Sequence, residues 1–109
     1  MSSNKKQALS WLETHSSEMY DMSDQLFKWA EPGLREYKSS KHLADYMKKQ
    51  GFDIEMDIAD MPTAFNSTWG DNGPLIGFFA EYDATPGHSQ KPVPYEEPDV
   101  PYGPGFTDA

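Results

Sequence analysis

The spacing of apolar residues predicts helices in the first half of the chain. Across residues 7–30, apolar side chains recur every three or four positions around a polar break, as in one helix or two that bury one face. Pro32 ends this region, because proline disfavours helical geometry in the residue before it. A further helix is expected from Ser39 or Ser40, both good N-cap residues, to just before Gly51. The tryptophans and methionines at helical spacing are expected in the core.

Strand patterns follow. Residues 52–58 alternate strictly between apolar and polar, which predicts a half-exposed strand, and residues 63–69 predict a second. The turn sequence at 71–73 suggests a hairpin into residues 75–82, whose continuous apolar run is typical of a strand covered on both faces. Two or three helices and about three strands therefore predict an α/β fold with an incomplete sheet. The boundary is expected near residue 85, before a tail over residues 86–109.

Two acidic residues end the apolar run. Glu81 and Asp83 are two positions apart, so along an extended strand both side chains point to the same side. In open α/β sheets, ligands bind just beyond the carboxyl ends of the strands. The pair is therefore placed to face a cation or a reacting group.

Composition narrows the function classes. The chain carries 18 acidic and nine basic residues, a net charge of −9, which disfavours nucleic-acid binding because phosphate contacts need lysine and arginine. It has no cysteine, and no apolar run approaches the roughly 20 residues that span a bilayer. The N-terminus lacks the pattern of a signal peptide, so a cytoplasmic protein without membrane association is expected. Residues 86–109 hold six of the nine prolines without periodicity, so this tail is expected to be extended and mobile.

Several short motifs together resemble a family of metal-dependent amidohydrolases and peptidases that includes aminoacylases, carboxypeptidase G and an aminobenzoyl-glutamate utilisation branch. They are the Trp29–Pro32 stretch, Glu36, Ser39-Ser40, Gly51-Phe52, Met61–Phe65, Trp69-Gly70, Ala80–Ala84, Pro86-Gly87 and Ser89-Gln90. The resemblance implies the N-terminal part of a zinc-peptidase-like catalytic domain, with Zn²⁺ or Mn²⁺ as cofactor. It also implies hydrolysis of a small-molecule amide: aminobenzoyl-glutamate, an N-acyl amino acid or a dipeptide.

The same resemblance gives the acidic pair its expected roles. Asp83 matches an active-site carboxylate that orients a metal-binding histidine by accepting its ring N–H; capping a loop is the alternative. Glu81 is expected as a metal ligand or as a group just outside the ligands, and a strand-end ion pair with a lysine is the alternative. His88 stands where the family has an apolar residue, so a solvated loop histidine is expected there. His15 and His42 are expected on solvated or partly packed helix faces.

The resemblance breaks at Phe106, where the family has the first histidine of a metal-ligand motif. A catalytic zinc site needs about three protein ligands. The chain is therefore expected to be a fragment of such a hydrolase, from a truncated or frame-shifted gene, that is inactive alone and binds no metal tightly. The alternative is a stand-alone, non-catalytic binding or regulatory module that associates with a full-length homologue. Exposed sheet edges make a homo- or hetero-oligomer plausible in either case.

Overall fold

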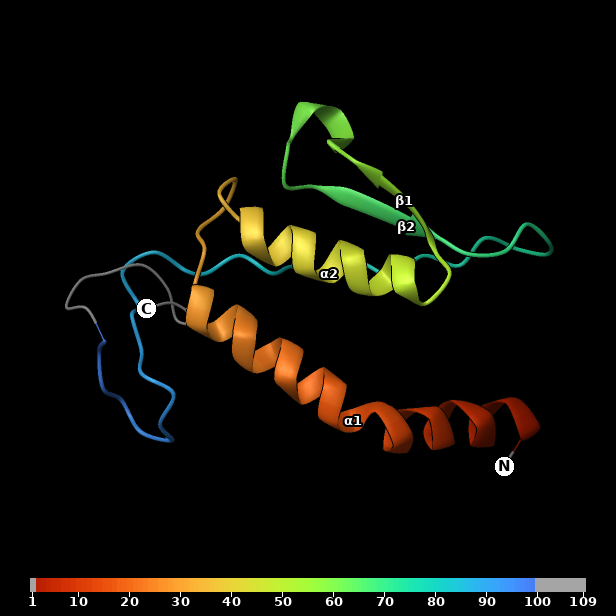
Figure 1. Cartoon of the computed structure of the whole chain (residues 1–109), viewed down its shortest axis with the longest axis horizontal. Coiled ribbons are helices and arrows are strands. Elements are labelled where there is room, and N and C mark those ends of the chain that lie inside the picture. The colour runs from red at the N-terminus through yellow and green to blue at the C-terminus, as the bar shows by residue number, and fades with distance from the viewer. Residues whose placement is uncertain (1, 100–109) are drawn as a thin grey trace.

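The computed structural model describes residues 2–99, which form two helices and a two-stranded sheet. The order is α1 (Ser3–Trp29), α2 (Tyr37–Lys49), β1 (Asp53–Met56), the short 3₁₀ helix η1 (Ile58–Asp60) and β2 (Phe65–Thr68). Helix α2 lies between α1 and the β1–β2 hairpin, and contacts both (Figure 1). The predicted α/β class with an incomplete sheet is confirmed. No helix within residues 2–99 is both long enough and apolar enough to cross a bilayer.

Helix α1 runs unbroken through the polar stretch that was a candidate break. The hydroxyls of Thr14 and Ser16 donate hydrogen bonds to the carbonyls of Ser10 and Glu13, at 3.0 and 3.2 Å. These bonds satisfy polar side chains inside the helix, so no break is needed. The helix ends at Ala30, which adopts a left-handed conformation with φ 49°.

Helix α2 begins before the predicted serines. In its first turn, the backbone N–H groups of Lys38 and Ser39 donate hydrogen bonds to the side-chain carboxylate of Glu31, at 3.0 and 2.6 Å. The predicted N-cap at Ser39 or Ser40 is wrong, because Glu31 reaches across the intervening loop and satisfies these donors. The predicted end is confirmed: Gly51 follows the helix with φ 99°, a conformation that favours glycine.

The first two predicted strands are confirmed, and they pair with each other as an antiparallel hairpin. The hairpin predicted through residues 71–73 is wrong, because the segment after that turn forms no strand. Asp53 pairs with Thr68, and Met56 pairs with Phe65. The connection through η1 includes three left-handed positions, at residues 57, 59 and 60, and the Met61 N–H donates to the Ile58 carbonyl at 3.0 Å. Each strand pairs on one edge only within the described residues.

The predicted third strand, residues 75–82, does not form. Residues 74–83 have no strand pairing, and the side chains of Leu75 and Phe78 are 93% and 96% exposed. The prediction failed because a strand needs a neighbour for its N–H and C=O groups, and no other described segment lies in register beside this one. The chain rejoins the fold at Ala84, whose N–H donates to the Glu31 carbonyl at 2.8 Å beside a parallel bridge to Pro32.

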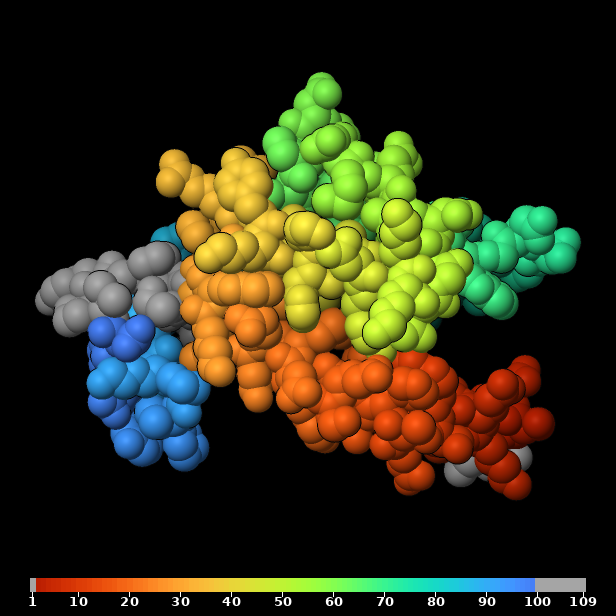
Figure 2. Space-filling view, viewed as in Figure 1, coloured from red at the N-terminus to blue at the C-terminus, as the bar shows by residue number. Residues whose placement is uncertain are grey.

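The buried centre is made of small and polar residues. Among the described residues, the fully buried apolar ones are three alanines, at positions 30, 44 and 84. The prediction of a core position is wrong for Trp11, which is 39% exposed, while Met22 and Trp29 are half-buried. Figure 2 shows the reason, because the first half of α1 projects away from the body of the molecule.

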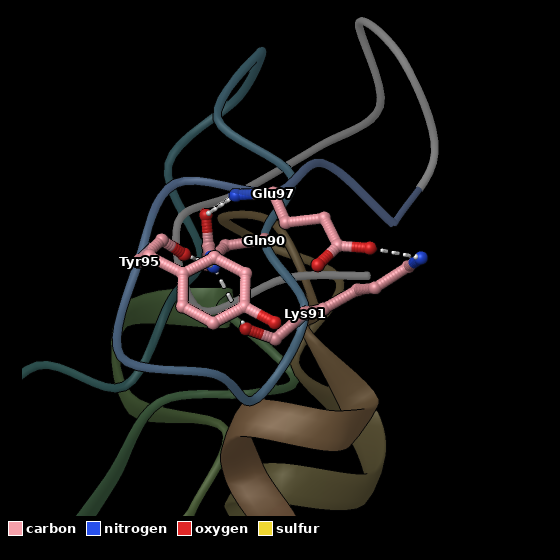
Figure 3. Close-up of polar contacts among 4 residues, drawn as sticks. All are labelled: Gln90, Lys91, Tyr95 and Glu97. Atoms are coloured by element: carbon pink, nitrogen blue, oxygen red, sulfur yellow. Dashed lines mark hydrogen bonds and ion pairs between the residues drawn. The ribbon is translucent and has the colours of Figure 1, made fainter.

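Residues 90–97 form a hydrogen-bonded loop instead of a simply extended tail (Figure 3). The Gln90 amide donates to the carbonyls of Lys91 and Tyr95, at 2.9 and 2.7 Å, and accepts from the Glu97 N–H at 3.0 Å. Lys91 and Glu97 also form an ion pair at 2.7 Å. The Gln90 side chain therefore adds to the backbone bonds of this loop, in which the Lys91 N–H donates to the Glu97 carbonyl at 2.8 Å, while the prolines at 92 and 94 have no N–H to donate. The mobility predicted for residues 86–109 stays a prediction, and residues 100–109 lie outside the described part.

Candidate functional site

The predicted acidic pair lines a concavity of about 180 Å³ beside the start of α2. Glu81 and Asp83 both border it and both are exposed. Tyr82 between them borders it as well, so the alternation of a strand does not account for their position. The remaining lining comes from three segments that are distant in sequence. These residues are Leu34, Glu36, Met61, Thr63, Ala64, Ala80 and Tyr82.

A hydrogen-bonded network holds this site together. The Thr63 hydroxyl donates to the buried carboxylate of Glu36 at 2.6 Å, and the Tyr82 hydroxyl donates to the Thr63 carbonyl. The ring of Tyr82 also lies 6.0 Å from that of Phe65 on β2, centroid to centroid. We call Glu31, Glu36, Thr63 and Tyr82 the polar junction, because they tie α2, the loop before β2 and residues 80–84 together.

Two groups of the polar junction have shifted pKa values. Partial burial, with a further contribution from the negative charge of Glu36, raises the pKa of the Tyr82 phenol above 10.0. Burial also raises the pKa of Glu31, but the hydrogen bonds from Lys38 and Ser39 outweigh it, so the net pKa lies below 4.5. At neutral pH Tyr82 is therefore a hydrogen-bond donor and Glu31 an ionised acceptor.

Carboxylates give the concavity its chemistry. Glu36, Glu81 and Asp83 border it without a lysine or arginine among the lining residues, so it suits a cation or a hydrogen-bond donor. Yet no group of three His, Cys, Asp or Glu residues within residues 2–99 is arranged to hold a metal ion. These residues alone therefore do not fit a catalytic metal, which needs about three protein ligands.

The histidines lie elsewhere. His15 stacks on Trp11 at 4.0 Å between ring centroids, and its Nδ1 lies 2.8 Å from the Trp11 carbonyl oxygen. His42 meets Trp29 edge to face at 5.3 Å. Both half-buried rings match the predicted partly packed helix faces, and His88 is exposed as predicted for a loop histidine.

A second hollow, of about 450 Å³, lies between the last turns of α1 and the loop that Gln90 organises. It contains none of the predicted site residues, and is lined by Asp24, Phe27, Lys28, Gln90, Pro92 and Val93. The Gln90 amide already uses its oxygen and its nitrogen within the loop. The glutamine is therefore a structural part of the wall.

Sequence reasoning missed the residues that support the acidic pair. Glu36 was noted without a role, and Thr63 only as the start of a strand. Their side chains meet across 27 positions of sequence, which no local pattern reveals. A glutamate directly before a predicted helix is at most a weak signal, and Glu36 makes no side-chain capping hydrogen bond that such a signal would have indicated.

Comparison with known proteins gives one informative similarity. The chain is 34% identical over 71 residues to a protein of Escherichia coli strain K12 that is named as a subunit of p-aminobenzoyl-glutamate hydrolase. The match covers 65% of this chain but about 15% of the length of that relative. No protein-family model matches the chain. No solved structure matches it either.

Proposed function

We propose that this chain takes part, in the cytoplasm, in the metal-dependent hydrolysis of an amide bond. The proposed substrates are aminobenzoyl-glutamate, another N-acyl amino acid or a dipeptide. The observation that carries the proposal is the 34% identity over 71 residues to a p-aminobenzoyl-glutamate hydrolase subunit. The acid-lined concavity supports it, because it brings Glu81 and Asp83 to one place.

In this proposal Asp83 positions a metal-binding histidine by accepting its ring N–H, and Glu81 lies beside the metal. A bound Zn²⁺ or Mn²⁺ would act as a Lewis acid and activate water. Because residues 2–99 do not supply a complete ligand set, the other ligands would come from polypeptide outside them. The isolated chain is accordingly expected to show no turnover with added Zn²⁺ or Mn²⁺.

The contribution of this chain's own residues is positional. Tyr82 stands between the two carboxylates in sequence, and its bond to the Thr63 carbonyl anchors that backbone. Thr63 is held in turn by Glu36 at the start of α2. The polar junction thereby fixes where Glu81 and Asp83 present their carboxylates.

The relative is named as one subunit of a hydrolase, and we extend this to propose that the present chain also works in association with another polypeptide. The test is a chimera of the Escherichia coli relative in which the 71-residue matching segment of this chain replaces the corresponding segment of the relative. Hydrolysis of p-aminobenzoyl-glutamate by the folded chimera is the expected result. A folded, metal-loaded chimera without hydrolysis would contradict the proposal.

Variants of the chimera test the individual roles. Asp83→Asn should lower metal affinity about 10- to 100-fold, the usual effect of losing the partner that orients a metal ligand. Asp71→Asn is the matched control, because Asp71 is an exposed acid in a turn and does not line the concavity. Equal metal affinity and hydrolysis in the two variants would remove Asp83 from the site.

A second candidate function is a non-catalytic binding module, and one observation favours it. The chain exposes large apolar side chains over residues 75–79, which a free-standing enzyme domain would bury. Hydrolysis of p-aminobenzoyl-glutamate by the chimera would support the first function. A folded chain that binds another polypeptide, in a chimera that hydrolyses nothing, would support the second.

A further inference from the structure

The segment of residues 75–80, which we call the apolar strand, is extended but unpaired. No backbone N–H or C=O in it forms a hydrogen bond with another described residue. Leu75, Ile76, Phe78 and Phe79 are each at least 72% exposed. Since neighbours along an extended segment point to opposite faces, both faces of the apolar strand are hydrophobic.

This segment nevertheless has a defined place in the fold. At its C-terminal end, Tyr82 is bonded to the Thr63 carbonyl, and the Ala84 N–H donates to the Glu31 carbonyl. Ala84 itself is 1% exposed. The apolar strand is therefore held at one end and open along its length, so that a partner strand can add to its edge.

Charge identifies the kind of partner. Residues 50–90 contain seven aspartates and glutamates and no lysine or arginine. Asp71 precedes the apolar strand, and Glu81 and Asp83 follow it. Pairing two copies in parallel would set Glu81 against Glu81, and antiparallel pairing would bring Asp71 near Asp83, both of which are destabilising. A net charge of −9 on each copy adds to the repulsion.

We propose that the apolar strand binds, through β-pairing, an apolar strand flanked by lysine or arginine that a different polypeptide donates. Backbone hydrogen bonds supply the pairing, the exposed side chains fill the partner's apolar surface, and the flanking carboxylates select basic residues. The inference goes beyond hydrolysis, and gives the second candidate function a surface and a partner class. Its assay uses neither substrate nor metal, so its failure leaves the result of the chimera untouched.

The test uses the full chain and two labelled synthetic peptides with the same Val-Ile-Val-Tyr-Val centre. One has two lysines at each end and the other has two glutamates. Fluorescence anisotropy should show saturable one-to-one binding of the lysine peptide, with the glutamate peptide at least about tenfold weaker at low salt. The difference should shrink as salt is added, because exposed charges are screened.

Substitutions at Gly77 locate the binding. Gly77→Pro removes an N–H that pairing requires and should abolish peptide binding. Gly77→Ala is the matched control and should leave binding unchanged, because a Cβ there meets nothing within 4 Å. Far-UV circular dichroism should be the same for both, since Gly77 has no backbone hydrogen bond to lose.

Two alanine substitutions, one inside the apolar strand and one far from it in sequence, provide a second check. Phe78→Ala should weaken binding of the lysine peptide about tenfold, as expected for a buried aromatic contact. Tyr20→Ala on α1, another largely exposed aromatic residue, should not. The proposal is overturned if neither peptide binds, if both bind equally, or if Gly77→Pro binds normally. It is also overturned if sedimentation shows a dimer of the chain that Phe78→Ala dissociates, because the occupant is then a second copy.

Discussion

The polar junction and the apolar strand differ from the usual arrangement of a protein, in which apolar side chains are buried and polar side chains are exposed. Glu36 and Thr63 are buried and hydrogen-bonded to each other, whereas Leu75 and Phe78 are exposed almost completely. Directional polar contacts therefore hold the described fold together. The apolar side chains of residues 75–79 contribute little to the stability of the fold and are available to another polypeptide.

The largest effect is expected from Thr63→Val, which keeps the side-chain shape and removes the hydrogen-bond donor to Glu36. A buried carboxylate that loses its hydrogen bond should lower the free energy of unfolding by about 2 kcal/mol. Urea denaturation measures the change. Thr68→Val, at an exposed position on β2, is the control, and equal effects at the two sites would show that the junction is not stabilising.

A smaller effect is expected from Tyr82→Phe, which removes the hydroxyl bonded to the Thr63 carbonyl. The loss should be about 1 kcal/mol at neutral pH. Because the folded state raises the phenol pKa, the wild-type contribution is complete below pH 10.0 and decreases as the pH rises above it. Tyr82→Phe should therefore flatten the alkaline limb of the stability curve. Tyr95→Phe, at an exposed ring, should not alter that limb.

Glu31→Gln tests the helix cap through acid titration. The folded state lowers the pKa of Glu31, so its contribution is complete above pH 4.5 and is lost as the pH falls through the folded pKa. The substitution should cost about 1 kcal/mol at neutral pH, the usual value of a helix N-cap, and less in acid. Thermal melts from neutral to strongly acidic pH measure this convergence, with Glu55→Gln on the exposed side of β1 as control. A constant difference at all pH values would argue against the ionised cap.

The smallest effect belongs to the apolar strand. Phe78→Ser should change the free energy of unfolding by less than about 0.5 kcal/mol, the usual range for an exposed site. A buried phenylalanine would cost about 3–5 kcal/mol. The urea midpoint of the monomer decides between these values, and a loss of the larger size would mean that the segment packs into the fold.

Local patterns predicted those elements that need only their own residues. Periodicity located α2, and Gly51 marked its end, because a left-handed position after a helix favours glycine. Strict alternation located β1. Glu81 and Asp83 both border one concavity, but Ala80 and Tyr82 border it too, so strand alternation does not explain their position and their expected roles stay predictions.

Long-range partners decided the rest. Glu31 caps α2 from eight positions before Ser39, and Glu36 meets Thr63 across 27 positions, so neither role has a local signature. The run at residues 75–82 has the composition of a buried strand and yet forms none, since composition cannot supply a neighbouring strand. Short-range backbone geometry sets the helices and the extended segments β1 and β2, so local patterns were enough to predict them, but not the pairing of β1 with β2 or the setting of the acidic pair. Only the tertiary structure decided what surrounds that pair and what stays uncovered, because hydrogen-bond partners and burial depend on which distant segments meet.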